Sequence, residues 1–152
     1  MIQTDIFQQA SMARLSERLD KLSQDRKPAW GKMNPSQMLA HLNVMFELGL
    51  EEKHQPPNAL LRFMLKAFVK NKVIGDKPYV KGSSTAPEMR IRHQPGFQTE
   101  KKRFLLYLTL LNEKGNTYFE QRAHPSFGKL SATEWSNLFY KHIDHHFNQF
   151  GI

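Results

Sequence analysis

Residues 131–150 read SATEWSNLFYKHIDHHFNQF, and this stretch decides the fold. Ser131 and Glu134 have the spacing of a capping box, which predicts a helix that begins at residue 132. The apolar residues that follow recur at helical spacing and form one stripe, the face that an amphipathic helix turns towards a protein core. The helix should run to about residue 150, where Gly151 suits its C-terminal end. The sequence therefore predicts a long helix that is packed on one side.

Two histidines lie in the middle of this apolar stripe. At about 100° per residue, with Trp135 at zero, His142 falls about 20° to one side and His146 about 20° to the other. Residues four apart on a helix share a face, so the two imidazoles can point at one metal ion. His145 falls near the edge of the stripe, and Gln149 lies near the side of the stripe that holds His142.

A second helix is predicted from the start signals Asn34, Pro35 and Gln37. Asn34 is a good N-cap, Pro35 fits the first helical position, and Gln37 can complete a capping box. This helix should run to about residue 51. His41 shares its apolar face with methionine and leucine side chains, so a third imidazole also points inward.

Three inward histidines on two helices need an explanation, because buried polar groups must find partners. One alternative is that each ring is a core histidine with a hydrogen bond of its own. For three rings that converge, a shared ion is the better explanation, since the cores of helical bundles commonly hold metal sites. We therefore predict one divalent metal ion bound by His41, His142 and His146.

The remaining sequence predicts three further helices and one long irregular segment. Helices are expected over residues 5–24, 58–73 and 97–113, whereas proline and glycine repeatedly interrupt residues 74–96. The run FLLYLTLL within 97–113 also fits a buried strand, but the preceding FQTEKKRF favours a helix that ends at Gly115. Irregular segments as long as 74–96 are often functional lids or binding loops.

The composition predicts a single domain over residues 1–152. A chain of 152 residues suits one domain, and 39% hydrophobic residues argue against disorder. No apolar run reaches the roughly 18 residues of a membrane span, and the N-terminus is too polar for a signal peptide. We therefore expect a cytoplasmic protein without a membrane partner.

Cysteine content and charge limit the chemistry and the partners. The chain has no cysteine, which excludes disulfides, thiolate ligands and cysteine nucleophiles. The net charge is +8, which we interpret as a solvated basic surface rather than a nucleic-acid-binding surface. Base rates among soluble proteins favour a homodimer.

Several of these residues resemble a known family. Residues 142–149, HIDHHFNQ, resemble the signature of the DinB/YfiT-like superfamily of helical-bundle metalloenzymes, which is HxxxH followed three residues later by Gln. Residues 30–41 and 124–128 are also similar to that superfamily, as is the order of one histidine on the second helix and two on the last. The matching stretches cover about half of the chain. The nearest likeness is to an uncharacterised bacterial branch.

The resemblance implies both a fold and a class of activity. The implied fold is all-α, an up-down-down-up four-helix bundle with a long irregular connection before the fourth helix. The implied cofactor is a divalent metal such as Zn or Ni, held by the three histidines. Relatives include hydrolase-like proteins and transferases that use small thiols. The resemblance therefore implies a metal-dependent hydrolase, or a thiol or group transferase, with a small-molecule substrate.

Residues around the metal have expected roles, and two other functions stay open. Three nitrogen ligands leave a position for water or substrate, as in catalytic sites. Gln149, His145 and His124 are candidates for contacts with the ligands or a metal-bound water, and the two histidines are also candidate bases. The alternatives are a solvated edge residue for His145, a turn residue for His124 and a packing role for Gln149. Neither carboxylate is a clear general base, since Glu47 lies away from the histidine face and Glu120 lies in a segment without a predicted structure. The alternatives are a metal-free bundle that binds a small ligand and, less favoured, a basic nucleic-acid-binding protein.

Overall fold

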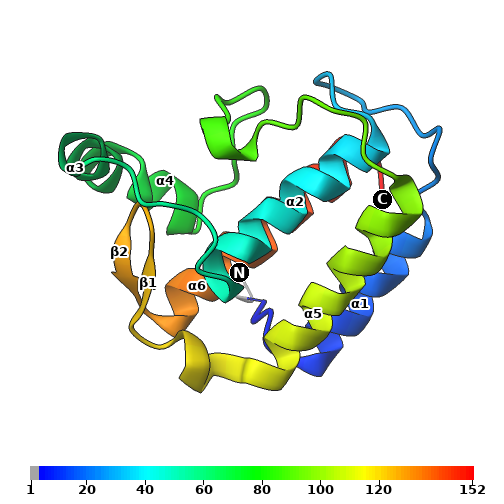
Figure 1. Cartoon of the computed structure of the whole chain (residues 1–152). Coiled ribbons are helices and arrows are strands. Elements are labelled where there is room, and N and C mark those ends of the chain that lie inside the picture. Colours follow the sequence, from blue (N-terminus) through cyan, green and yellow to red (C-terminus); the bar gives the residue numbers. More distant parts are fainter. Residues whose placement is uncertain (1–3) are drawn as a thin grey trace.

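The computed structural model describes residues 4–152 and consists mainly of helices, with one small two-stranded sheet (Figure 1). The described elements, in chain order, are α1 (Gln9–Asp20), α2 (Pro35–Leu50), α3 (Ala59–Phe68), α4 (Lys70–Ile74), the 3₁₀ turn η1 (Pro87–Met89), α5 (Phe97–Phe119), β1 (Arg122–His124), β2 (Gly128–Leu130) and α6 (Ala132–Gln149). None of the helices in this described part has the length and apolar character needed to cross a bilayer.

The four long helices α1, α2, α5 and α6 enclose one hydrophobic core. The Asn43 amide donates to the Glu100 carboxylate, and farther along both helices the Tyr107 hydroxyl donates to Glu51, so α2 and α5 run in the same direction. Figure 1 shows α1 and α6 running in the opposite direction. In chain order, the directions of these four helices are therefore up, down, down and up.

The starts of α2 and α6 confirm the predicted capping boxes. The Asn34 side chain accepts from the Gln37 backbone N–H at 2.9 Å, and the Gln37 side chain accepts from the Asn34 backbone N–H at 3.1 Å. The same reciprocal pair joins Ser131 and Glu134. Each box satisfies two backbone donors that a helix start leaves free. These local bonds fix where the two histidine-bearing helices begin.

Two predicted helices have different bounds in the structure. The helix expected over 5–24 is shorter, because the Asp5 carboxylate accepts from the backbone N–H of Phe7 and forms a turn ahead of α1. The helix expected over 58–73 is split at Val69, whose φ of −109° separates α3 from α4.

The prediction of a helix over 97–113 is confirmed, and the alternative of a buried strand is wrong. Its predicted end at Gly115 is confirmed in part, because the helical backbone is interrupted at this residue. The chain kinks at Gly115, with φ 63° and ψ −174°, and then resumes helical structure to Phe119. Glycine tolerates this backbone geometry because it has no Cβ.

A β-hairpin precedes α6 and was not predicted. Strands β1 and β2 pair antiparallel, with Arg122 opposite Leu130 and His124 opposite Gly128. Each strand has three residues, which is too short for alternation to be visible in the sequence. The indole N–H of Trp135 donates to the Arg122 carbonyl at 3.1 Å and ties the hairpin to α6.

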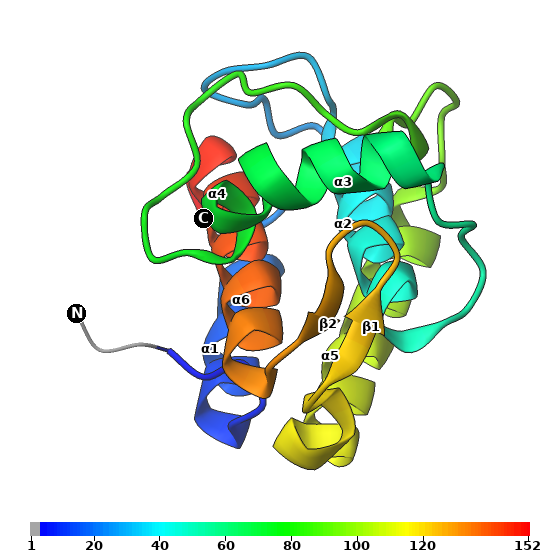
Figure 2. The same cartoon turned by 90° about the vertical axis from the view of Figure 1, so that its left-hand side faces the viewer.

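The segment between α4 and α5 is irregular apart from η1, as predicted for 74–96. Figure 2 shows it crossing the end of the molecule where α2 begins and α6 ends. The turn η1 contacts α2 there. The segment thus covers the part of the core in which the histidines lie.

Candidate metal centre

The structure brings His41, His142 and His146 together between α2 and α6. Their ring centroids form a nearly equilateral triangle, with sides of 4.9 Å, 4.7 Å and 5.0 Å. One ring nitrogen from each residue lies within 4.8 Å of the other two. His41 and His146 are buried and His142 is half-buried. We call these three residues the histidine cluster.

A backbone carbonyl fixes the orientation of His41. Its Nδ1 lies 2.8 Å from the Met89 carbonyl oxygen in η1, so Nδ1 carries the proton and donates. A neutral imidazole has one N–H, which leaves a lone pair on Nε2. This Nε2 lies 2.8 Å from Nε2 of His142, so His142 donates to His41. The lone pair of His41 therefore points into the cluster.

A second chain of hydrogen bonds fixes His146. The Gln149 amide nitrogen donates to the Trp30 carbonyl at 2.7 Å, which leaves the amide oxygen facing His146. That oxygen lies 2.7 Å from His146 Nδ1, so Nδ1–H donates to it. The free lone pair of His146 is then on Nε2. Partners of this kind commonly set the tautomer and ring orientation of metal-binding histidines.

Gly31 makes room for this second chain of hydrogen bonds. Its φ is +82°, and a Cβ at this position would lie 2.5 Å from the Gln149 amide nitrogen. Any other residue would be strained and would push the amide away from the Trp30 carbonyl. The Trp30-Gly31 pair therefore supports the site through its backbone.

The electrostatics of the cluster favour neutral rings. Burial lowers the pKa of His41, lowers that of His142 well below its ordinary value, and lowers that of His146 to about 3. Repulsion between neighbouring imidazoles adds to the effect at His142 and His146. In the described part of the chain, no carboxylate forms an ion pair with any of the three. The cluster thus offers neutral imidazole nitrogens as potential metal ligands, without a counter-charge.

These distances fit a bound ion after small side-chain movements. Two nitrogens bound tetrahedrally at about 2.0–2.1 Å from one ion lie about 3.3 Å apart. The His41–His142 separation of 2.8 Å is shorter than this, and the widest separation of up to 4.8 Å is longer. Rotations of the rings can equalise these spacings, because neither the Met89 carbonyl nor the Gln149 amide blocks the inward nitrogens.

Aromatic rings cover the outer side of the cluster. The His145 ring contacts His146 at 5.1 Å between centroids, Tyr79 at 5.6 Å and Trp30 at 5.8 Å. The Tyr79 ring also packs against the His142 ring in a T-shaped arrangement, with 5.6 Å between the centroids. His145 is half-buried, in agreement with its predicted place at the edge of the stripe. It lies between the cluster and the irregular segment.

The structure places His124 away from the histidine cluster. It lies at the end of β1. Its ring stacks on the Phe127 ring, with 4.6 Å between centroids, and contacts the Trp135 ring, with 5.4 Å between centroids. Its Nδ1 accepts from the Ser126 backbone N–H at 3.1 Å, so its proton is on Nε2. Burial lowers its pKa to about 4. The described contacts of His124 therefore serve the hairpin.

The two carboxylates considered as bases also lie elsewhere. Glu47 is buried between α2 and α5, where it pairs with Arg103 at 2.6 Å. Glu120 is exposed and accepts from the Ala132 backbone N–H at the start of α6. Three supporting groups, by contrast, were missed by the sequence analysis: the carbonyls of Met89 and Trp30, and the ring of Tyr79. The position of a backbone carbonyl cannot be read from residue types, and Tyr79 lies in a segment without a periodic pattern of apolar residues.

Comparison with known proteins identifies a family. A family model described as "Protein of unknown function (DUF1569)" matches residues 4–151. The chain belongs to the DUF1569 family. No curated protein and no solved structure matches it. Because this family description names no activity, the function of this DUF1569 protein has to be argued from its site.

Proposed function

We propose that this DUF1569 protein is a metal-dependent enzyme, a hydrolase or a thiol or group transferase, that acts on a small molecule. The proposed cofactor is Zn or Ni, held by His41, His142 and His146. The observation that carries the proposal is the convergence of three neutral imidazoles, two of which have their Nδ1 protons fixed by outward hydrogen bonds. Imidazole nitrogens whose lone pairs point into the cluster, and which have no acidic partner, are complementary to a cation.

Three protein ligands leave room for one more, which distinguishes a catalytic from a structural site. A metal bound there would lower the pKa of a coordinated water or thiol and thereby supply a nucleophile near neutral pH. The protein's own part is to hold the rings in place through Met89 and Gln149. Tyr79 and Trp30 would exclude bulk water, and His145 would position a substrate at the outer edge of the site.

We also propose that the fold is a DinB/YfiT-like four-helix bundle. The up, down, down, up directions of α1, α2, α5 and α6 support this proposal, as does the position of one histidine on α2 and two on α6. Bundle cores commonly hold metal ions between facing helices. The hairpin and α3 would then be additions to the four long helices.

Elemental analysis of the purified protein tests the proposed site. We expect one Zn or Ni per chain after metal-replete expression, and a loss of that metal in His142→Ala. His93→Ala is the matched control, because His93 is an exposed histidine outside the cluster and should retain the metal. Absence of metal from the replete wild-type protein would instead favour a metal-free ligand-binding bundle, in which the His142–His41 hydrogen bond persists.

An assay of the loaded protein tests the proposed chemistry separately. Hydrolysis of activated esters or amides, and transfer of small thiols to electrophiles, should both be measured with wild-type protein and His142→Ala. Activity that requires both metal and His142 supports the enzyme. A stoichiometric metal with no activity in either assay would leave a metal-binding protein and contradict the proposed reaction classes.

A further inference from the structure

Helix α3 is more exposed than the long helices α1, α2, α5 and α6, each of which has buried residues. It has ten residues, and none of them is buried. Its large apolar side chains are largely open to solvent: Leu60 (74%), Leu61 (48%), Phe63 (66%), Met64 (46%) and Phe68 (64%). We call these five residues the α3 apolar face. Single exposed apolar residues are ordinary, but a contiguous group of this size marks an interaction surface.

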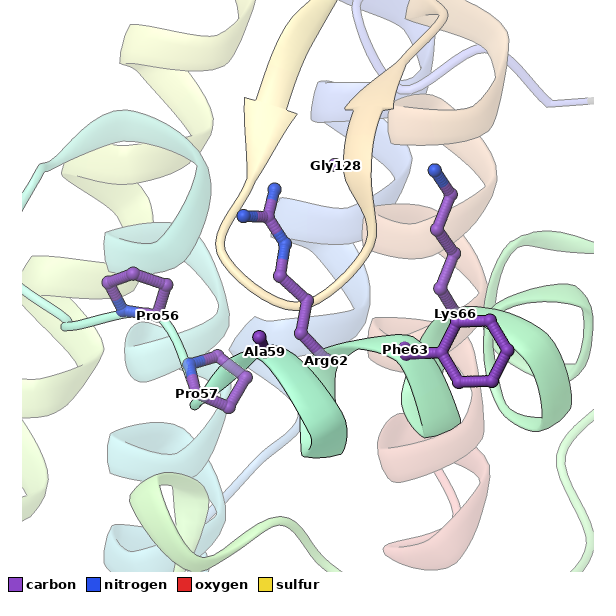
Figure 3. A pocket seen from close by; sticks show the side chains of 7 residues that line it. All are labelled: Pro56, Pro57, Ala59, Arg62, Phe63, Lys66 and Gly128. Carbon is purple, nitrogen blue, oxygen red and sulfur yellow. The ribbon is translucent and has the colours of Figure 1, made fainter.

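The opposite side of α3 faces the rest of the molecule. Leu65 and Val69 are half-buried and pack against the core. Figure 3 shows Arg62 and Lys66 pointing from α3 towards the β1–β2 hairpin, across a surface hollow. The end of each side chain lies 3.8 Å from the position that a Cβ on Gly128 would occupy. The cations of α3 are therefore turned away from its apolar face.

The positions of the charged side chains on α3 indicate what kind of partner the α3 apolar face binds. An anionic membrane or an acidic protein would be recognised by cations beside the apolar residues. Here Arg62 and Lys66 face the protein's own hairpin, and the nearby Lys70 pairs with Glu134 at 3.4 Å. The α3 apolar face itself carries no charge, so two such faces can meet without like-charge repulsion. We propose that it is the interface between two copies of this chain.

The size of the face agrees with a dimer. A fully exposed Phe presents about 200 Å², so Phe63 and Phe68 together expose roughly 260 Å² at the fractions given above. With its three aliphatic residues, the face reaches on the order of 500 Å². Two copies would bury about 1,000 Å², the least expected of a specific interface, before the flanks of α3 contribute.

The helix also needs a partner for its own stability. Isolated helices shorter than about 12–15 residues are marginal in water, and α3 has ten residues, of which only Leu65 is half-buried, followed by the half-buried C-cap Val69. In a twofold contact each α3 would pack antiparallel to its mate, with Met64 at the crossing because it is central in the face. The same patch then serves both subunits, as an isologous interface requires.

Light scattering during size-exclusion chromatography tests the proposed dimer. We expect the wild-type protein to have twice the chain mass of 17.8 kDa at micromolar concentrations. Phe63→Glu should weaken association by about 100-fold or more, because the lost contact occurs twice in a symmetric interface. Leu106→Glu is the matched control: Leu106 is 59% exposed on α5, outside the face, and its variant should remain dimeric.

Crosslinking tests the position of the symmetry axis. The chain has no cysteine, so Met64→Cys introduces the only thiol. Mild oxidation should link two copies of Met64→Cys but not two copies of the control Leu106→Cys, because a disulfide needs Cα atoms within about 7 Å. Circular dichroism checks that the variants keep the helical content of the wild type, and Phe63→Ser is a milder replacement for Phe63→Glu.

Three results would overturn the proposal. They are a monomeric wild type across the micromolar range, a dimer that survives Phe63→Glu, and equal crosslinking of Met64→Cys and Leu106→Cys. Binding of a monomeric wild type to vesicles of anionic phospholipid would assign the face to a membrane surface instead. None of these experiments depends on the metal site.

Discussion

Two buried polar clusters lie on different faces of α2, and they are built in opposite ways. The first lies between α2 and α5 and consists of Glu47, Glu100 and Arg103, with Asn43 and His54 beside them; we call it the charged seam. Arg103 pairs with Glu47 at 2.6 Å and with Glu100 at 3.0 Å, and His54 pairs with Glu47 at 2.7 Å. The second is the histidine cluster between α2 and α6.

The two clusters differ in whether their charges are balanced. Burial alone would raise the pKa of Glu47, but hydrogen bonds from His54, Arg103 and Lys53 outweigh burial and lower it. The seam therefore contains both signs of charge and neutralises itself. The histidine cluster contains only neutral donors, and burial lowers the pKa of each ring. The comparison indicates that the seam balances its own charges, whereas the histidine cluster has no counter-charge among the described residues.

The largest expected effect comes from removing a metal from the histidine cluster. At a free metal concentration about 1,000 times the dissociation constant, binding stabilises the folded state by about 4 kcal/mol. A chelator should therefore lower the melting temperature by roughly 10 °C in a domain of this size. Melting curves with and without chelator measure this shift. In His142→Ala the two curves should coincide, and an equal shift there would mean that the metal binds elsewhere.

The next largest effect is expected from His124, a buried imidazole that belongs to neither cluster and can be compared with both. Its folded pKa of about 4 lies below the ordinary 6.5, so the unfolded chain takes up a proton first as the pH falls. The contribution of neutral His124 to the free energy of unfolding is fully present above pH 6.5. It is lost as the pH falls from 6.5 to 4, by about 3 kcal/mol in all.

Urea unfolding at about pH 7 and about pH 4 measures this loss. In His124→Asn the side-chain oxygen still accepts from the Ser126 N–H but does not titrate, so the loss on acidification should be smaller by that amount. An unchanged loss would show that the proton goes to another group.

A similar or smaller effect is expected from unbalancing the charged seam. Arg103→Met leaves Glu47 and Glu100 buried without their shared cation, which should cost about 2–3 kcal/mol of unfolding free energy because Arg103 is itself partly exposed. Urea unfolding measures the cost. Lys102→Met, at the exposed neighbouring position, should cost little. Metal content should stay the same in both variants, and a loss of metal in Arg103→Met would contradict the separation of the two clusters.

The smallest effect is expected from the support of His146. Gln149→Leu removes the acceptor that fixes the Nδ1 proton, which should weaken metal binding by about 10- to 100-fold. Competition with a chromophoric chelator, well below the melting temperature, measures the affinity. Gln149→Glu keeps an acceptor at this position and should bind much more tightly than Gln149→Leu. If both variants bind equally weakly, Gln149 acts through packing rather than through its oxygen.

Helix periodicity and capping determined much of this protein. The capping boxes at Asn34 and Ser131 formed as predicted, because they depend only on residues three positions apart. The pattern also placed His41 and the pair His142 and His146 on inward faces, since 3.6 residues per turn fixes which side chains share a face. The spacing of residues along the two helices thus predicted the three histidines that the structure brings together.

Other features depended on contacts between distant segments. The carbonyls of Met89 and Trp30 reach the site through the backbone, which has no residue-specific signal. The hairpin consists of strands too short to show alternation, and α3 is as apolar as a core helix although none of its residues is buried. The sequence by itself determined which residues face inward along each helix, because that depends on local geometry. Only the tertiary structure decided which inward faces meet, which backbone groups orient the histidines and which apolar face stays open, because these depend on packing between segments far apart in the chain.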